Sequence, residues 1–387
     1  MITAPVVLPV HRPKTVVIGA GVIGLGIAWR LVQAGCVVTV FDRGEAVHGA
    51  SWAAAGMLAA AVETEPGEEP LLPLALESQR LWPDFARELE AASGISVNYR
   101  DEGTLVVALN RDDAAQLRHS YEFQKGLDLD LHWLSAAEAR AREPHLKPGI
   151  AAAVWSPRDH QVENRDLGRA LAVAARKAGV ELVEHCAVRE AVLAGDRITG
   201  VVTERGREPA DVVVLAAGAW SRAIEGLPSA ARPPVRPVKG QMLSLRMDAR
   251  APLLRHVVWA PDVYLVPRHD GRLLVGATVE EKGFDPHLTA GGQLTLLNAA
   301  WRALPGIEDL PLEESWVGFR PGSRDDAPIL GRGAVEGLVY ATGHHRNGIL
   351  LTPITAQTIA GLILDGQSDP VIAPFALDRF TPAVAAE

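Results

Sequence analysis

The sequence is poor in cysteine and in clustered positive charge. Its 387 residues include two cysteines, Cys36 and Cys186, which lie far apart and match neither a disulfide framework nor a metal-binding spacing. We therefore expect a reducing, cytoplasmic setting. Lysine and arginine number 38 against 47 aspartate and glutamate residues, which gives a formal net charge of −9. This balance argues against nucleic acid or an anionic membrane as an obligate partner, because both require clustered basic residues.

Long apolar runs are also missing. The longest late apolar stretch, residues 348–364, is interrupted by threonine, proline and glutamine and is too polar to span a membrane. The first residues are broken by Pro9 and Pro13 and lack the features of a signal peptide, so we expect a short arm there. Repeats and low-complexity segments are absent, and the length suits two domains of ordinary size.

The first pattern along the chain predicts a buried β–α–β unit. Residues 16–18 are a short apolar run, typical of a strand buried on both faces. A glycine-rich turn and a helical stretch to about residue 34 follow, and Gly35 stands where a helix often ends. A second apolar strand, residues 37–41, closes on Asp42.

The turn between strand and helix has the pattern G-x-G-x-x-G, formed by Gly19, Gly21 and Gly24. The first glycine permits a tight turn, the second lets the backbone approach a pyrophosphate, and the third lets helix and strand pack closely. The helix N-terminus favours the anion, and Asp42 is placed to accept the ribose hydroxyls. This pattern predicts a dinucleotide but does not separate NAD from FAD.

Two further segments favour FAD. Residues 49–57 consist almost wholly of small side chains, which let a backbone lie against a flat ring, and Ser51 offers a hydroxyl to phosphate. The alternative for this segment is a tightly packed, alanine-rich helix. Residues 211–220 form a buried strand that ends in an alanine and Gly218, a point of close approach late in the same domain.

The rest of the chain alternates helical and strand patterns. A hairpin is predicted where residues 264–268 and 272–277 flank the sequence His-Asp-Gly. Sequence patterns of fully buried strands occur at the start, in the middle and at the end of the chain, and patterns of half-exposed strands lie between them. This distribution indicates two interleaved domains. Helices are expected near 72–92, 112–127, 164–178 and 294–304 and from about 348, and strands near 103–109 and 212–217.

The chain resembles the D-amino-acid-oxidase superfamily of flavoproteins, and within it the glycine oxidases of the thiamine pathway. The most specific parts of this resemblance are residues 53–58, 264–268, 318–322 and 343–353. The resemblance runs from about Thr15 to Gly366. It implies an α/β (α+β overall) fold, in which an FAD-binding dinucleotide fold of the glutathione-reductase type is interleaved with an antiparallel-sheet substrate domain. We assign 13–91, 148–232 and 317–381 to the FAD-binding domain, and 92–147 and 233–316 to the substrate domain.

The resemblance also implies a set of cofactor contacts. FAD is expected to be non-covalent, because residues 319–331 hold no cysteine and Ala53 follows Trp52 where some relatives attach flavin to a histidine. The expected cofactor residues are Gly19, Gly21, Val22 and Ile23 at the pyrophosphate turn, with Gly24 where helix and strand pack, Asp42 and Arg43 at the ribose, and Ala50 and Ser51 at the phosphates. They continue with Ala55, Gly56 and Met57 at the flavin, Val188 at the adenine and Gly218 at the close approach. His344, His345, Arg346, Asn347, Gly348, Ile349 and Leu350 are expected around the isoalloxazine at the start of the last helix.

For the substrate, the resemblance points to two arginines, Arg320 and Arg346, with Tyr264 and Met57. A guanidinium is the best anchor for the carboxylate of an amino acid. The alternative for Arg320 is a structural pair with Asp325 or Asp326. For Arg346 it is a surface charge at a helix start, and for Tyr264 a place in the core.

The implied activity is FAD-dependent oxidative deamination of glycine, with sarcosine and small D-amino acids as further candidates. Hydride leaves Cα for the flavin, oxygen reoxidises it, and the imine hydrolyses to an oxo acid and ammonia. No catalytic base is named, because the reaction needs none if the amine binds in its neutral form. The role of the protein is then to orient the substrate, exclude water and tune the electrostatics of the flavin. No metal site is expected, since the adjacent His344 and His345 lack a ligand cluster. His48 and His160 are interpreted as surface or packing residues.

Two alternatives stay open at this stage. One is a dehydrogenase that passes electrons to a quinone or another carrier in place of molecular oxygen. The other is a flavoprotein that acts mainly as the partner of a thiazole synthase. Assembly into a homo-oligomer is the family expectation.

Overall fold

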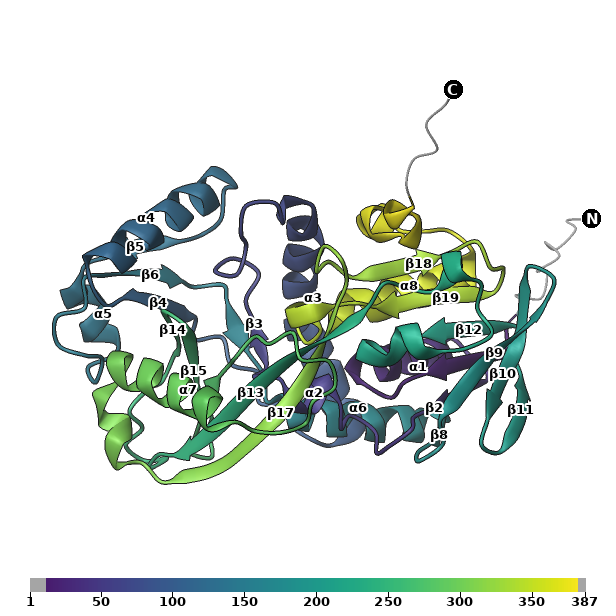
Figure 1. The fold of residues 1–387 in the computed structure, drawn as a ribbon, viewed down its shortest axis with the longest axis horizontal. Coiled ribbons are helices and arrows are strands. Elements are labelled where there is room, and N and C mark those ends of the chain that lie inside the picture. Colours follow the sequence, from purple (N-terminus) through teal and green to yellow (C-terminus); the bar gives the residue numbers. More distant parts are fainter. Residues whose placement is uncertain (1–11, 382–387) are drawn as a thin grey trace, which may run out of the picture.

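The computed structural model describes residues 12–381 (Figure 1). Most of the predicted N-terminal arm lies outside these residues. Within them, no helix combines the length and the apolar character needed to cross a membrane. The described residues form two large β-sheets and two small ones, with helices around them, and strands β13 and β17 run from one large sheet towards the other (Figure 1).

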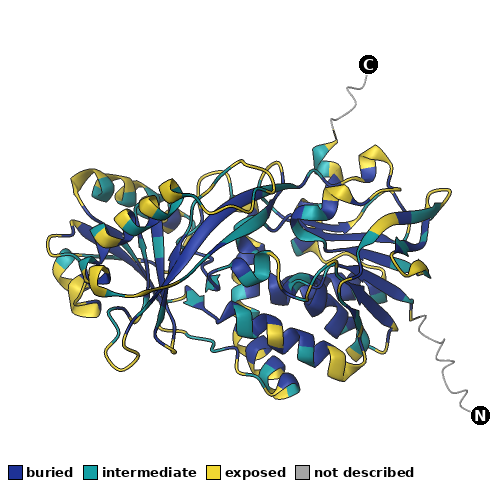
Figure 2. Cartoon of the chain, turned by 60° about the horizontal axis from the view of Figure 1, so that its bottom comes forward, coloured by how far each residue is buried: buried dark blue, intermediate teal, exposed yellow. Residues whose placement is uncertain are grey.

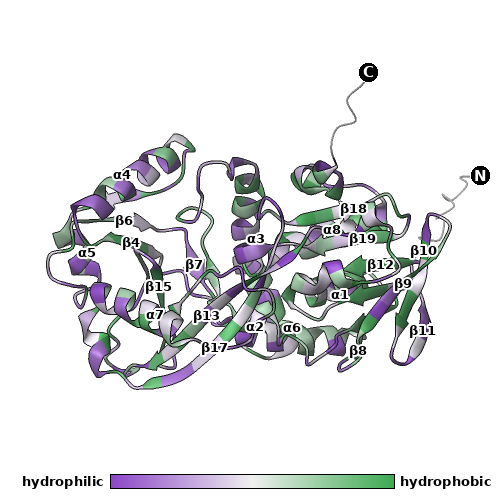
Figure 3. Ribbon diagram, viewed as in Figure 1, coloured by the Kyte–Doolittle hydropathy of each residue, from purple (hydrophilic) through white to green (hydrophobic). Residues whose placement is uncertain are grey.

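The first sheet carries the β–α–β unit. Its strands pair in the order β18-β19-β12-β1-β2-β8, and all neighbours are parallel except β18 and β19. The strands are short and apolar, as Figure 3 shows for β12. Their bounds are β1 Thr15–Ile18, β2 Val38–Phe41, β8 Glu181–Val183, β12 Val212–Leu215, β18 Ile329–Arg332 and β19 Leu338–Thr342.

Both faces of this sheet are covered, which explains its continuous apolar strands. Val17 of β1 packs in the core shared with the helices, whereas Val16 and Ile18 pack in a second core with a three-stranded antiparallel sheet. The helices are α1 Val22–Gln33, α3 Leu72–Ser93, α6 Asn164–Ala178 and α8 Thr352–Asp365, and the small sheet consists of β9 Val188–Ala194, β10 Arg197–Thr203 and β11 Gly206–Pro209.

The second large sheet is mixed, with strand order β17-β13-β16-β15-β14-β4-β6-β5 and one parallel pair, β14 with β4. Helices α4 Arg111–Gly126, α5 Ala136–Arg142 and α7 Ala290–Ala303 lie around it and expose their outer faces (Figure 2). The strands are β4 Thr104–Ala108, β5 His132–Leu134, β6 Ala152–Ser156, β13 Arg236–Arg246, β14 Val257–Ala260, β15 Val263–Pro267, β16 Arg272–Gly276 and β17 Leu312–Gly322.

The predicted fold class is confirmed, as are the elements of the β–α–β unit and the hairpin formed by β15 and β16. The domain boundaries stay a prediction. Strand β6 lies within the piece 148–232 assigned to FAD binding, yet it pairs in the eight-stranded sheet. The last helix begins at Thr352, four residues later than expected, because a 3₁₀ turn at His345–Asn347 precedes it.

Candidate functional site

A cavity of about 1440 Å³ opens between the two large sheets. Pockets for drug-sized ligands have volumes of roughly 300–1,000 Å³. This cavity is larger and has room for a dinucleotide together with a small substrate. Of the predicted site residues, Gly24, Asn347 and Leu350 do not line it. Those that do are Gly19, Gly21, Val22, Ile23, Asp42, Arg43, Ala50, Ser51, Ala55, Gly56, Met57, Val188, Gly218, Tyr264, Arg320, His344, His345, Arg346, Gly348 and Ile349.

The glycine turn is built as its spacing predicts. Gly19 has φ +106°, and a Cβ there would lie 2.4 Å from the carbonyl oxygen of Ala216. A Cβ on Gly24 would lie 2.0 Å from the carbonyl oxygen of Gly19, so this glycine serves the contact between helix and strand. Gly21 stands at the N-terminus of α1, with no acidic residue in the first turn. The positive end of the helix therefore faces the cavity.

Two side chains hold this turn in place. The Val22 amide donates to Ser51 Oγ at 3.2 Å. Asp42 accepts from the Ala20 amide at 2.8 Å and from the Gly44 amide at 2.9 Å. A carboxylate has about four acceptor positions, so Asp42 keeps lone pairs for hydroxyl groups of a ligand. Its predicted role at the ribose is compatible with these backbone bonds and stays a prediction.

A cluster of aromatic side chains lies beside the cavity near Arg43. The Arg43 guanidinium lies 3.7 Å from the centroid of the Trp220 ring. Trp220 stacks on Phe284 with ring centroids 4.9 Å apart, and Phe284 meets Phe319 at 5.4 Å. Arg43 is thereby placed by cation–π contact, which orients its positive charge beside the cavity.

The small-residue segment forms a four-residue helix, α2 Ala50–Ala53, and then an extended stretch. Gly56 has φ +71°, and a Cβ there would lie 2.1 Å from the carbonyl oxygen of Val162. The buried Arg268 fixes this stretch, because its guanidinium donates to the carbonyl oxygens of Ala55 and Val162, both at 2.7 Å. Burial lowers the pKa of Arg268 to about 10, which leaves it charged at neutral pH.

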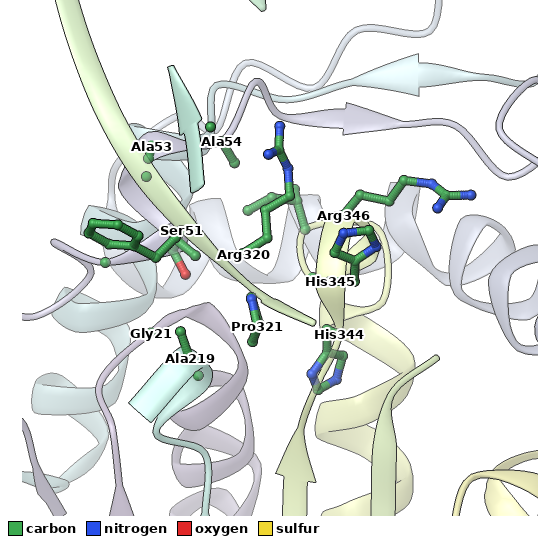
Figure 4. A pocket seen from close by; sticks show the side chains of 18 of the residues that line it. Gly21, Ser51, Ala53, Ala54, Ala219, Arg320, Pro321, His344, His345 and Arg346 are labelled. Atoms are coloured by element: carbon green, nitrogen blue, oxygen red, sulfur yellow. The ribbon is translucent and has the colours of Figure 1, made fainter. Parts of the chain in front are cut away.

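The turn before α8 brings two histidines to the cavity (Figure 4). Burial lowers the pKa of His344 to about 3. For His345, burial and the positive charges of Arg320 and Arg346 lower the pKa to about 3. Both rings are therefore neutral at neutral pH. His345 Nδ1 is buried and has no hydrogen-bond partner among residues 12–381.

Arg320 extends from β17 over the cavity (Figure 4). Its Nη1 donates to the carbonyl oxygen of Thr278 at 3.1 Å, and no carboxylate of the described residues forms an ion pair with it. The structural pairs considered from the sequence are not formed. Asp325 pairs with Arg379 at 2.8 Å, and Asp326 lies 3.4 Å from Arg236. Arg320 therefore offers a guanidinium to an anionic ligand.

Arg346 is held differently, and its guanidinium extends away from Arg320 (Figure 4). Its Nε lies 3.0 Å from a Glu63 oxygen, and its Nη2 lies 2.6 Å from a Glu68 oxygen. It is not a surface charge, since 27% of its side chain is exposed. With two carboxylates already bound, it has less capacity for a substrate carboxylate than Arg320, so its predicted substrate role stays a prediction.

Apolar and aromatic side chains surround the end of the cavity near Arg320. Tyr264 packs against Trp259 with ring centroids 5.1 Å apart, and its hydroxyl lies 3.7 Å from Met242 Sδ. Burial raises the pKa of Tyr264, while Arg320 lowers it and Glu63 raises it. Met57 packs in the same cluster. Trp259 Nε1 is buried and without a hydrogen-bond partner in the described part of the chain.

These features fit a flavin dinucleotide. The glycine turn leaves no room for side chains, and the N-terminus of α1 points at the cavity. The buried Nδ1 of His345 has no hydrogen-bond partner among residues 12–381. When FAD is bound, Gly19 to Ile23 would hold its pyrophosphate, and Ala55 to Met57 with the 344–349 turn would hold its rings. Metal-binding clusters of three or more histidine, cysteine, aspartate or glutamate side chains do not occur within residues 12–381.

Three residues of the cavity region were not identified from the sequence. Glu63 lies in an acidic stretch, 63–69, that is typical of a solvated loop. Arg268 ends a predicted strand, and Trp259 lies in an alternating pattern typical of core. Glu63 and Arg268 have no local signal, because each contacts a segment far away in the sequence.

A family model described as FAD dependent oxidoreductase matches residues 14–362. The glycine oxidase of Geobacillus kaustophilus is 38% identical over 381 residues, which covers 97% of this chain and 100% of that protein. The crystal structure of a glycine oxidase from the same species superposes with a TM-score of 0.88 at 37% identity, covering 95% of this chain and 99% of the other.

The bifunctional protein ThiO/ThiG of Trichormus variabilis is 39% identical over 367 residues. The alignment covers 94% of this chain and 55% of that protein, so the chain spans about half the length of this relative. The family match and the shape of the cavity agree on FAD as the cofactor.

Proposed function

The chain belongs to the FAD-dependent oxidoreductase family, and we propose that within it this protein oxidises glycine to the imine, which hydrolyses to the oxo acid and ammonia. The observation that supports this most is Arg320, a guanidinium at the cavity without a carboxylate partner among residues 12–381. Relatives named glycine oxidase at 38% identity support the same substrate. Sarcosine and small D-amino acids remain candidates.

In this mechanism the chain binds and orients the substrate. Arg320 holds the carboxylate, and the phenol of Tyr264, which burial keeps protonated, donates a hydrogen bond to it. Trp259 and Met57 border the same space and exclude water from it. FAD supplies the two-electron acceptor for the hydride that leaves Cα. Fixing Cα in one orientation is the main contribution of the protein to the rate.

We propose molecular oxygen as the second substrate, with hydrogen peroxide as the product. The alternative is a quinone or another electron carrier. We further propose a place in thiamine biosynthesis, with a thiazole synthase as a partner that consumes the imine, since three relatives are bifunctional ThiO/ThiG proteins. A cytoplasmic location and a homo-oligomer complete the proposal.

A paired assay tests the function. Oxygen consumption is measured with glycine, sarcosine and D-alanine, and ammonia release with glycine and D-alanine, each with and without an artificial quinone acceptor. We expect one ammonia and one hydrogen peroxide for each oxygen consumed with glycine. Turnover that requires the quinone contradicts the oxidase proposal and supports the dehydrogenase. No turnover with either acceptor contradicts both and leaves the partner role to be tested by addition of a thiazole synthase.

A further inference from the structure

The end of the cavity near Arg320 contains a three-residue cluster whose charges do not balance. Arg346 shares its single positive charge between Glu63 at 3.0 Å and Glu68 at 2.6 Å. With both carboxylates ionised the cluster is negative, and with one protonated it is neutral. Glu63 is the inner of the two, since its side chain is 12% exposed and that of Glu68 is 24% exposed. Glu63 also lines the cavity, whereas Glu68 does not.

We propose that Glu63 accepts the proton that the ammonium group of the substrate loses when the amino acid binds. This proposal rests on the proposed amino-acid oxidation. Hydride leaves Cα readily only when the amine is neutral, because the nitrogen lone pair forms the new C=N bond. In the step itself an N–H bond of the ammonium breaks and leaves its electron pair on nitrogen, and an O–H bond forms on Glu63. Nothing is oxidised, and the proton passes to solvent after product leaves.

The position of Glu63 suits this role. Arg320 and Glu63 are the two charged groups that act on the pKa of the Tyr264 phenol, with opposite signs. The phenol, the proposed carboxylate anchor and the proposed proton acceptor therefore line one cavity, close enough for both charges to act on the phenol. An α-amino acid carries its ammonium group two bonds from its carboxylate carbon, so a substrate held by Arg320 beside Tyr264 presents its amine to the same part of the cavity.

The backbone before Glu63 is fixed by a buried carboxylate. Asp159 accepts from the Ala61 amide at 3.0 Å and from the Val62 amide at 2.8 Å, and Gln79 donates to it at 3.1 Å. Arg346 holds the side chain from the other side. Asp159 thus acts as a positioning residue, and it keeps Glu63 at the cavity wall rather than in solvent.

Burial and the surrounding charges bring the pKa of the Glu63 carboxyl group close to neutral pH. Burial raises its pKa to about 7, Arg346 opposes this, and Asp159 and Glu68 add to it. Glu65, an exposed carboxylate that also lines the cavity, raises the pKa of Arg346, and the raised pKa of Tyr264 keeps its phenol neutral. The other titratable groups near Arg320 are unsuitable acceptors, because His344 and His345 have pKa values of about 3 and bind protons weakly. A proton acceptor works best with a pKa near the working pH.

The experiment is the pH profile of kcat/KM for glycine in the holoenzyme and in two variants. In the wild type, kcat/KM should rise with pH and level off near pH 7. In Glu63→Gln only substrate already neutral at nitrogen reacts. The rise should therefore extend to the ammonium pKa of glycine, with a loss of roughly tenfold for each pH unit below it.

Glu68→Gln is the matched control, since it also removes one carboxylate from Arg346. Its rise should move to lower pH, because loss of the Glu68 charge lowers the pKa of Glu63. The two variants thus shift the profile in opposite directions. Equal shifts, or an unchanged profile in Glu63→Gln, would overturn the proposal. FAD content by absorbance checks that each variant is loaded.

A third variant guards against misfolding. Glu63→Asp keeps a carboxylate and should keep a rise near neutral pH, so a profile like that of Glu63→Gln would also overturn the proposal. Failure of the proposed function gives a different result, since the wild type then shows no turnover of glycine at any pH. The rate of flavin bleaching by glycine without oxygen is an independent measurement. It should rise with pH over the same range as kcat/KM.

Discussion

The two ends of the cavity are built by different means. At the nucleotide end, the backbone forms the predicted pyrophosphate site. Gly19, Gly21 and the first turn of α1 make up this site and lie within a few residues of one another. At the substrate end, side chains from distant segments meet, among them Arg320 from β17 and Arg346 from the turn before α8. Even two arginines at that end differ, since one has two carboxylate partners and the other has none within residues 12–381.

The contrast between the two ends shows which structural features can be predicted from a local sequence pattern. The glycine spacing and Asp42 were predictable because the chemistry of the turn is local. The substrate role of Arg320 was inferred through resemblance and stays a prediction; the structure shows only that Asp325 and Asp326 pair with other arginines.

Other contacts had no local signal. Arg346 and Glu63 are 283 residues apart, and Arg268 and Ala55 are 213 apart. An acidic stretch in a loop resembles a solvated surface until the fold brings a guanidinium to it. The late start of α8 was also missed: a 3₁₀ turn at His345–Asn347 precedes the helix, and the residue before that turn, His344, forms a β-bridge with Gly322.

The largest effect is expected at Arg320. Arg320→Ala should raise KM for glycine, because a carboxylate without its charged partner in a secluded pocket costs on the order of 2–5 kcal/mol, a factor of roughly thirty to several thousand. FAD content and melting temperature should change little. Steady-state kinetics beside a melting curve measure both, and normal KM with lost stability would assign Arg320 to structure.

Arg346→Ala sharpens the contrast between the two arginines. It removes the common partner of Glu63 and Glu68, so we expect a loss of stability of about 1–3 kcal/mol, reduced from the value of a fully buried pair by the remaining solvent. KM for glycine should rise less than in Arg320→Ala. An equal rise in KM would show that Arg346 also binds substrate, as the resemblance implies.

At the nucleotide end, Gly19→Ala should weaken FAD binding. The new Cβ meets the carbonyl oxygen of Ala216, and φ +106° strains any other residue, at a cost of about 1–3 kcal/mol or roughly 5- to 150-fold in affinity. Titration of apoprotein with FAD measures this. Gly361→Ala in α8 is the control, since nothing lies within 4 Å of its added Cβ. Equal FAD affinities in the two variants would contradict the backbone account.

The charged cluster predicts a pH dependence of stability. Because the folded protein holds the Glu63 proton up to about pH 7, above the ordinary range of a carboxyl group, folding stability from this group falls as pH rises to about 7 and is then constant. Glu63→Gln lacks this slope. Melting temperatures of both proteins between pH 5 and pH 8 should therefore converge or cross as pH rises. Parallel curves would contradict the raised pKa.

The smallest effect is expected at Ser51. Ser51→Ala removes the acceptor of the Val22 amide, which costs about 0.5–1.5 kcal/mol and should weaken FAD binding roughly 2- to 13-fold. Ser120→Ala on the exposed face of α4 is a control for the change of residue type. An FAD affinity equal to that of the control would remove Ser51 from the predicted pyrophosphate site.

Reduction of the bound flavin by glycine tests the central claim, that one cavity holds FAD and an amino acid anchored on Arg320. Purified protein is mixed with glycine without oxygen, and the flavin absorption bands are followed before and after air is admitted. We expect bleaching in the wild type, recovery in air, and bleaching in Arg320→Ala only at far higher glycine concentration. Flavin that stays oxidised in the wild type at any glycine concentration would contradict this claim.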